Sequence, residues 1–314
     1  ALPISAVALL APAQVGVDRV PVEPQARGQP REHRDERLGA RLGRRTAARV
    51  WCVALGAPSA VMTFAPHPRE FFNPEAAKLR LMRPREKIDG LRAMGFDYVF
   101  MPRFNATFAA TGAEDFIAQM LVKLLAVKHI VTGNNFCFGA KRSGNSQLLA
   151  DATGRYSFDY RAMAQVAWDT GVISSTAIRT ALSEGKLDEA GHLLGHPYTV
   201  CGHVTHGDKR GRALGFPTAN IPLGKLFLPR AGVYAVRVQG AGGSDQEGVA
   251  NIGVRPTVGG GKPQAEIHLF DFSGDLYGKY IRVQLRSFIR DEQKFVSIDA
   301  LKEQIVRDCE EARK

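Results

Sequence analysis

The sequence predicts two folded domains of different classes: an α/β domain with a parallel, doubly wound sheet at residues 51–196, and a small antiparallel β-barrel at residues 197–314. In the first region, strand-length apolar runs alternate with amphipathic helical stretches, which is typical of a parallel sheet covered by helices. After Tyr198 the pattern changes to short strands separated by turns at regular spacing, which indicates a barrel. The length of 314 residues also favours two domains.

Residues 1–50 differ in composition from both domains. They contain nine arginines but no lysine and no phenylalanine, and their apolar residues show little periodicity. We therefore expect a basic, poorly ordered segment ahead of the α/β domain.

Net charge and cysteine usage limit the function classes. The formal charge of +11 suits an anionic ligand such as a nucleotide, and it suits nucleic acid equally well. No recognised nucleic-acid-binding motif accompanies this charge, so we expect no specific nucleic-acid partner. The four cysteines form no Cys-x-x-Cys pair, which is typical of reduced thiols in a cytoplasmic protein. No apolar run is long enough to span a membrane, so no membrane partner is expected.

Three strands and two helices are expected in the first part of the α/β domain. The strands are Val61–Phe64, Tyr98–Phe100 and His129–Val131, and the helices are Arg85–Met94 and Ala113–Leu125. The second helix would bury a face made of Phe116, Ile117, Met120, Leu121 and Leu124. After the first strand, Pro66 and Pro68 hold His67 in a rigid loop, where α/β folds commonly bind ligands. A loop histidine beside two prolines is equally compatible with a structural role.

A further helix is expected to begin at Ser174, Ser175 and Thr176. Their hydroxyl groups and the first N–H groups converge at the positive end of the helix, which is a suitable place for a phosphate. Arg179 lies one turn further and can reach the same anion. An ordinary N-cap would explain these residues as well. A second short helix, Leu187–Leu194, ends at Gly195, so we place the domain boundary between residues 196 and 197.

The stretch Gly202–Asn220 is the most informative part of the barrel region. Its candidates for phosphate contact are Gly207, Lys209, Arg210, Gly211 and Gly215. Glycines allow backbone N–H groups to approach an anion closely, and basic side chains supply the opposite charge. Thr218 and Asn220 place a hydroxyl and an amide oxygen on one side of an extended segment, which suits Mg²⁺. Surface loops without a ligand are often glycine-rich and basic too.

Several of these motifs resemble those of the bacterial bifunctional riboflavin kinase/FAD synthetase (FMN adenylyltransferase) family. The resemblance runs from about Val53 onward, and its motifs are Arg103–Asn105, Ile173–Arg179, Pro217–Asn220, Asn251–Thr257, Glu266–His268 and Phe288–Arg290. It implies a nucleotidyltransferase-like, Rossmann-like first domain and a riboflavin kinase barrel. It also implies ATP as co-substrate, Mg²⁺ as metal, and riboflavin and FMN as partners.

For the kinase half, the resemblance implies that Thr218 and Asn220 bind Mg·ATP and that Phe288 and Arg290 contact the flavin. We expect Glu266 to be the general base. A carboxylate within hydrogen-bond reach can take the proton from the ribityl 5′-hydroxyl as the γ-phosphoryl group arrives. Strand geometry places Glu266 and His268 on one side of the sheet, opposite Ile267 and Leu269. The predicted function is ATP-dependent phosphorylation of riboflavin to FMN.

For the adenylyl-transfer half, the resemblance implies nucleotide or flavin contacts by His67, Asn105, Asn135, Ser174, Ser175, Thr176 and Arg179. The chain departs from the family here. Asn135 stands where the family has an aspartate, and the run Gly-x-Phe-Asp-Gly-x-His-x-Gly-His is not found. In the family, those histidines stabilise the leaving pyrophosphate. Its absence argues against FAD synthesis and leaves the expected sheet without its first strand.

Three alternative functions stay open at this level. One is a fully bifunctional FAD synthetase, and another is a basic nucleic-acid-binding protein. The third is a flavin-binding carrier that keeps the fold without the chemistry. The set Thr218, Asn220 and Glu266 argues against a carrier, because a carrier needs no such set.

Overall fold

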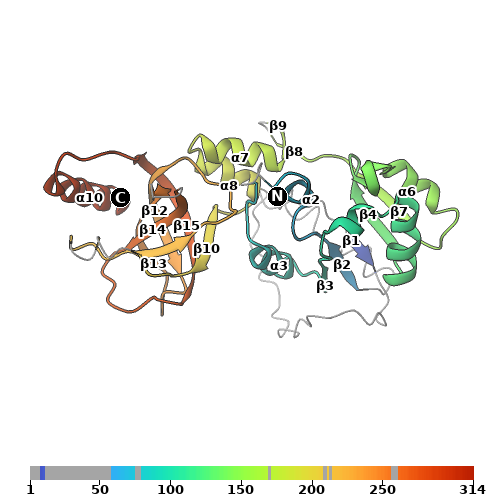
Figure 1. Cartoon of the computed structure of the whole chain (residues 1–314), viewed down its shortest axis with the longest axis horizontal. Helices are drawn as coiled ribbons and strands as arrows, with labels where there is room; N and C mark the ends of the chain where they lie inside the picture. Colours follow the sequence, from blue (N-terminus) through green and yellow to red (C-terminus); the bar gives the residue numbers. More distant parts are fainter. Residues whose placement is uncertain are drawn as a thin grey trace, which may run out of the picture. The chain divides into compact units, whose positions relative to one another are not determined.

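The computed structural model describes residues 8–10, 58–74, 79–168, 171–207, 211, 214–255 and 261–314. The chain divides into two compact units (Figure 1). The sheet unit comprises the described residues up to 74 together with 84–172, and the barrel unit comprises 79–83 together with the described residues from 173 onward. Within these ranges, no helix is long and apolar enough to cross a membrane.

The sheet unit is built on five strands in the order β3-β2-β1-β4-β7. These are β1 (Ala8–Leu10), β2 (Ser59–Met62), β3 (Tyr98–Phe100), β4 (His129–Gly133) and β7 (Asp159–Met163). The pairs β2–β3 and β4–β7 are parallel, whereas β1 runs antiparallel to both β2 and β4. Four strands therefore point in one direction, and their carboxyl ends meet at one edge of the sheet.

The central strand β1 corrects the expectation that this sheet lacks a first strand. Ala8–Leu10 pairs with β2 on one side and with β4 on the other. Without it, the facing edges of β2 and β4 would leave rows of backbone N–H and C=O groups unpaired inside the unit. The sheet is therefore mixed at its centre, although its two outer pairs are parallel as predicted.

Within the described residues, seven helical segments connect these strands. They are α2 (Pro68–Phe72), α3 (Pro84–Ala93), α4 (Ala106–Ala109), α5 (Ala113–Asp115), η2 (Phe116–Leu124), η3 (Ala140–Arg142) and α6 (Ser146–Ala152). Two short two-stranded sheets also occur. They pair β5 (Cys137–Phe138) with β6 (Gly144–Asn145) and β8 (Ala167–Trp168) with β9 (Gly171–Val172).

The expected helix Ala113–Leu125 exists, but most of it is wound as a π-helix. Its end is marked by the bond from the Leu125 N–H to the Met120 carbonyl, five residues back. The wider turn rotates Leu124 off the buried face, so that this side chain is 39% exposed, while Leu125 takes its place in the core. The prediction that Leu124 is buried was therefore wrong, whereas the buried positions of Phe116, Ile117 and Leu121 are confirmed.

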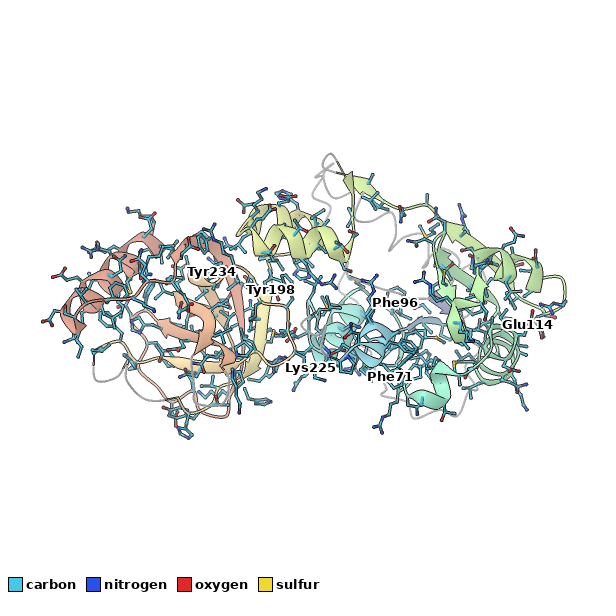
Figure 2. The ribbon with its side chains drawn as sticks, turned by 45° about the horizontal axis from the view of Figure 1, so that its top comes forward. Phe71, Phe96, Glu114, Tyr198, Lys225 and Tyr234 are labelled. Carbon is cyan, nitrogen blue, oxygen red and sulfur yellow. The ribbon has the colours of Figure 1, made fainter. Side chains whose placement is uncertain are left out.

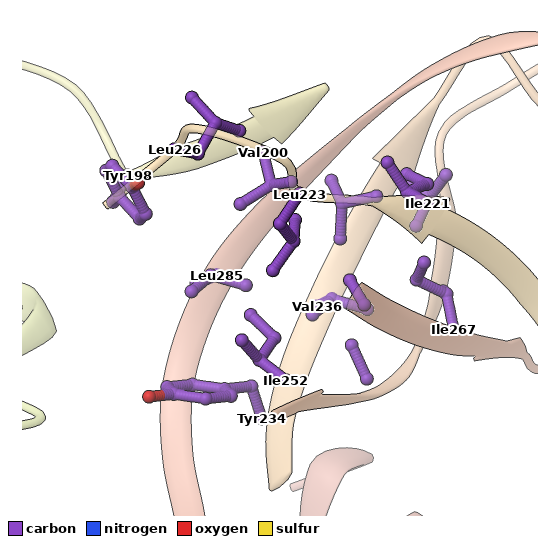
Figure 3. Close-up of a cluster of buried hydrophobic side chains, with 14 of the residues drawn as sticks. Tyr198, Val200, Ile221, Leu223, Leu226, Tyr234, Val236, Ile252, Ile267 and Leu285 are labelled. Carbon is purple, nitrogen blue, oxygen red and sulfur yellow. The ribbon is translucent and has the colours of Figure 1, made fainter. Parts of the chain in front are cut away.

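The barrel unit is built on six antiparallel strands in the order β10-β15-β12-β13-β14-β11. These are β10 (Thr199–His203), β11 (Ala219–Pro222), β12 (Gly232–Gln239), β13 (Gln246–Arg255), β14 (Lys262–Leu269) and β15 (Tyr280–Asp291). A bridge between Thr205 and Asn220 brings the two edges together and nearly closes the barrel. Alternate side chains, including Ile221, Tyr234 and Ile267, fill its interior (Figure 3). The antiparallel barrel predicted from the sequence is confirmed.

Two helices before the first barrel strand and one short segment also belong to the barrel unit. The helices α7 (Ser175–Ser183) and α8 (Leu187–Leu194) share a hydrophobic core with the barrel strands. The segment Leu79–Arg83, which interrupts the sheet unit in sequence, lies along Leu226, and its Arg80 carbonyl accepts from the Phe227 N–H at 2.8 Å. Leu81 is 3% exposed in the same core. The compact units thus divide at residue 173, whereas the boundary predicted from the sequence between 196 and 197 marks the first barrel strand.

The C-terminal helix α10 (Ile298–Ala312) covers the outer face of the barrel. Cys309 and Ala312 pack on a small apolar cluster formed by Val233, Val249 and Phe270. Burial raises the pKa of the Cys309 thiol, with a further contribution from neighbouring Asp308, so the thiol stays protonated. Helix α10 is therefore a packed part of the barrel unit.

Candidate functional site

The glycine-rich loop packs directly against the Pro-Thr-x-Asn segment. A Cβ on Gly207 would overlap the side-chain amide of Asn220, and a Cβ on Gly211 would overlap the Phe216 carbonyl oxygen and lie 3.3 Å from Thr218 Oγ1. Both glycines are therefore required for this close approach. Gly215, in the turn between Gly211 and Thr218, has a φ of +90°, a conformation that favours glycine. Lys209 and Arg210, the two predicted basic contacts, fall outside the described residues.

Asn220 carries an unused acceptor inside the protein. Its side chain is 5% exposed, and its Oδ1 accepts no hydrogen bond from any described residue. Its Nδ2 donates in a long contact of 3.4 Å to the Thr218 carbonyl. A buried amide oxygen without a partner is costly unless a ligand completes it. An oxygen donor of this kind, beside the Thr218 hydroxyl, fits a hard cation such as Mg²⁺.

Glu266 lies in register with Asn220 across the β11–β14 pair. On its other side, the same residue is opposite Asn251 of β13. Directly paired residues in antiparallel strands point to the same face, so these three polar side chains form a row on the outer face of the barrel. The burial pattern of β14 confirms the predicted facing: Ala265, Ile267 and Leu269 are buried, while Glu266 and His268 are half-buried.

His268 ties the outer face of β14 to the Pro-Thr-x-Asn segment. The His268 ring nitrogen Nδ1 lies 2.9 Å from the Pro217 carbonyl, and its ring meets Phe216 edge-on. The Gln264 Nε2 donates to Glu266 Oε1 at 2.8 Å. The strand that carries Glu266 is therefore linked by side chains to the segment that carries Thr218 and Asn220.

Phe288 and Arg290, the predicted flavin contacts, are both engaged within the protein. The Phe288 ring packs edge-on against Tyr234 at 5.3 Å between centroids, and the Arg230 guanidinium lies 4.6 Å from its centre. Arg290 makes a two-pronged ion pair with Asp308 of α10, at 2.8 and 2.7 Å. Asp308 is 3% exposed, so this pair fixes α10 to β15. Arg290 and Glu266 lie on the same outer face, because directly paired residues connect them across the strands through Asn251 and Val233. Phe288 instead packs on the barrel core.

In the sheet unit, the three predicted residues lie after three strands of common direction. His67 follows β2, Asn105 follows β3 and Asn135 follows β4, so all three occur at the carboxyl edge. The first two loops are joined, since the Phe104 N–H donates to the Ala65 carbonyl at 3.2 Å. Phe71, which is labelled in Figure 2, and Phe64 both pack edge-on against the Phe104 ring.

Two of these side chains also serve as helix caps. His67 Nδ1 accepts from the Arg69 N–H at 3.2 Å at the start of α2, and Asn105 Oδ1 accepts from the Phe108 N–H at 2.8 Å at the start of α4. The His67 ring therefore carries its proton on Nε2 in this geometry. Asn135 is exposed in the turn after β4.

The serine-rich helix start belongs to the barrel unit. Ser174 caps α7 by accepting from the Ala177 N–H at 3.1 Å, Ser175 opens the helix, and Thr176 is exposed beside it. Arg179 donates its Nε–H to the Leu79 carbonyl at 2.9 Å, so its side chain ties α7 to the Leu79–Arg83 segment. An ordinary N-cap, one of the two interpretations left open by the sequence, describes Ser174 in this structure.

The sequence motifs did not single out Gln264 or Asp308. Gln264 could have been recognised by its place two residues before Glu266, on the same face of a strand. Asp308 interrupts the apolar face of α10 beside Ile305 and Cys309, and a carboxylate on a buried helix face calls for a cationic partner. That partner, Arg290, lies on strand β15, and only the fold brings it next to Asp308 on helix α10.

Comparison with known proteins agrees with this architecture. Residues 47–177 match the FAD synthetase family model, and residues 194–314 match the riboflavin kinase family model. The bifunctional riboflavin kinase/FMN adenylyltransferase of Escherichia coli K12 is 50% identical over 80% of each chain. That of Haemophilus influenzae is 44% identical over 88% of this chain and 90% of its own.

A solved structure from Streptococcus pneumoniae has the same overall fold. That protein is named a macrolide-efflux protein, and it is 30% identical with a TM-score of 0.76, covering 90% of this chain and 92% of its own. Its name concerns efflux, whereas both family models and the curated relatives concern flavin nucleotides. On the identity and coverage of these relatives, the chain belongs to the bifunctional riboflavin kinase/FMN adenylyltransferase family.

Proposed function

We propose that this chain phosphorylates riboflavin at its ribityl 5′-hydroxyl, using Mg·ATP, to give FMN and ADP. The observation that carries the proposal is the pairing of Asn220 with Glu266. A buried amide oxygen without a partner among the described residues lies in register with a carboxylate on the next strand. A metal-binding group and a base are thereby held side by side, as phosphoryl transfer to an alcohol requires.

Each part of the site has a role in this reaction. Thr218 and Asn220 would hold Mg²⁺, which would supply positive charge against the phosphates. Backbone N–H groups of the loop from Gly207 to Gly215 contact the phosphates, and Lys209 and Arg210 add positive charge. Glu266 accepts the proton from the ribityl hydroxyl as the γ-phosphoryl group transfers to its oxygen.

The flavin is proposed to lie near β15 and α10. Arg290 and Phe288 act there as parts of the wall, since each is held by a protein partner. The Arg290–Asp308 pair keeps α10 against the barrel, so that the flavin meets a preformed surface.

Adenylyl transfer from ATP to FMN is a second candidate activity, favoured by the FAD synthetase match over residues 47–177. In the sheet unit, its proposed contacts are His67, Asn105 and Asn135 at the carboxyl edge. The other residues proposed for it, which belong to the barrel unit, are Ser174, Ser175, Thr176 and Arg179. The printed sequence contains no His-x-Gly-His run, so these residues would lack the usual groups that stabilise the leaving pyrophosphate. We therefore propose that kinase activity exceeds adenylyl transfer, in a protein of the cytoplasm.

The kinase proposal is tested by supplying riboflavin and Mg·ATP labelled at the γ-phosphate. The label is expected in FMN, with ADP formed in equal amount and the reaction abolished by a chelator. A flavin carrier would bind riboflavin without transferring label. A nucleic-acid-binding protein would instead bind random duplex DNA with strong salt dependence and leave riboflavin unchanged.

A further inference from the structure

Gln264 is placed to act on Glu266. The two residues are two positions apart on β14, so their side chains lie on the same outer face, and both are half-buried. The Gln264 Nε2 donates to Glu266 Oε1 at 2.8 Å, a length typical of a sound hydrogen bond. This contact involves one of the two oxygens of the proposed base.

The two residues paired directly with Gln264 on the adjacent strands have no polar side chain. It is paired with Pro222 on β11 and with Gly253 on β13. The space above Gly253 is taken by the Glu292 carboxylate, which a Cβ at position 253 would overlap. Glu292 is itself held, because its Oε1 accepts from the Asn251 Nδ2 at 3.2 Å. Since the directly paired residues provide no polar side chain, the Gln264 amide bonds to Glu266 instead.

We propose that Gln264 is a positioning residue for the kinase reaction, which fixes the carboxylate of Glu266 in the orientation that receives the ribityl proton. The inference rests on the proposed role of Glu266 as general base. A glutamate side chain has three rotatable bonds and loses much freedom when it is held in one rotamer. Holding it in advance matters, because proton transfer needs the base at hydrogen-bond distance from the hydroxyl in the reactive complex.

The test is a double-mutant cycle with Glu266→Gln and Gln264→Leu, measured by steady-state kinase turnover. Gln264→Leu keeps the size of the side chain and removes its donor. We expect kcat to fall about tenfold, while the KM values for riboflavin and Mg·ATP change by less than about twofold. In the Glu266→Gln background, the same substitution is expected to cause no further loss, because its effect passes through the base.

Gln239→Leu provides a matched control. Gln239 also lies in the barrel, at the end of β12, and its Nε2 donates to Asp245 Oδ2 at 3.1 Å. This variant loses the same kind of hydrogen bond away from Glu266, so kcat is expected to stay unchanged. Gln264→Ser serves as a second variant if Gln264→Leu fails to fold, with the same expected loss.

Different outcomes separate the two proposals. If Glu266→Gln keeps full turnover, the base assignment fails and the positioning role falls with it. If Glu266→Gln is inactive but Gln264→Leu has normal kcat, only the positioning role is overturned. If Gln264→Leu lowers kcat equally in both backgrounds, Gln264 acts independently of Glu266, which also overturns the inference.

Discussion

The two units hold their candidate residues in different ways. In the barrel unit, Asn220 and Glu266 are brought together by strand register, and the backbone pairing of β11 with β14 fixes their separation. In the sheet unit, His67 and Asn105 follow separate strands, and both side chains are used to begin short helices. A site set by register needs few residues to define it, whereas a site set by loops depends on the conformation of every loop that contributes to it.

The polar side chains of the two candidate sets show the same difference. Asn220 in the barrel unit keeps a buried oxygen without a described partner, which is a cost that ligand binding can offset. In the sheet unit, the capping atoms of His67 and Asn105 already accept backbone N–H groups. Of these candidate atoms, the Asn220 oxygen in the barrel unit is therefore the one left to bind a metal ion.

The largest expected effect is the loss of kinase kcat in Glu266→Gln, with His67→Ala as the comparison in the other unit. Removing the base should lower kinase kcat by about 10²–10⁴-fold, while binding of Mg·ATP changes little. His67→Ala removes a helix cap in the other unit and should leave kinase kcat unchanged. Product assays and nucleotide-binding titrations of both variants measure these effects. Near-normal turnover of Glu266→Gln would show that Glu266 is not the base.

Leu81→Ala and Leu91→Ala, ten positions apart in sequence, should weaken different units. Leu81 is 3% exposed in the barrel core, and Leu91 of α3 is fully buried in the sheet unit. Each truncation should cost about 2–5 kcal/mol through lost contacts and a cavity. Hydrogen exchange should rise in β11 and β12 for Leu81→Ala, and in β2 and β3 for Leu91→Ala. Equal effects on both units would contradict the assignment of Leu79–Arg83 to the barrel unit.

Gly207→Ala tests the contact between the glycine-rich loop and Asn220. Its new methyl group would overlap the Asn220 amide, so either the loop or the amide must move. We expect the KM for Mg·ATP to rise about tenfold, with a smaller change in the KM for riboflavin. Gly154→Ala in the sheet unit is the control, since its Cβ would meet no atom closer than 3.7 Å. An unchanged KM for Mg·ATP would remove Asn220 from the proposed metal site.

The smallest expected effect is a pH dependence confined to the sheet unit. Burial lowers the pKa of His129 below its ordinary value, and nearby Arg161 acts in the same direction, while Asp159 partly opposes them. The unfolded chain therefore binds a proton more readily than the folded one as the pH falls below about 6.5. The free energy of unfolding of this unit should fall between about pH 7 and pH 5, by at most about 1.4 kcal/mol per pH unit.

His129→Gln should flatten this dependence, whereas His192→Gln, which changes an exposed residue of α8 in the barrel unit, should leave it unchanged. Thermal unfolding followed by hydrogen exchange at several pH values measures both. A sheet unit whose stability is constant over this range in the original chain would contradict the prediction.

The barrel could be predicted well from the sequence because period-two patterns and turns determine strand facing. The outward position of Glu266 follows from the alternation along β14 alone. The pairing of Glu266 with Asn220 could not be predicted in this way, because register across distant strands depends on the whole barrel. The link between Arg290 and Asp308 was missed for the same reason.

The sheet unit was predicted less completely. Ala8–Leu10 lies in a region without periodicity, and three residues are too few to be recognised as a strand. The π-helical winding of η2 also escaped prediction, because the apolar pattern of Phe116–Leu124 fits an ordinary helix. The other expected strands and helices are present, with ends shifted by a few residues.

The most direct test of the kinase proposal is a chromatographic product assay on one preparation of the protein. Riboflavin with Mg·ATP is supplied in one reaction and FMN with Mg·ATP in the other. We predict FMN in the first reaction and little or no FAD in the second, as the difference between the two units implies. FAD in the second reaction would show that the sheet unit is catalytically complete. Absence of FMN from the first would contradict the proposed function itself.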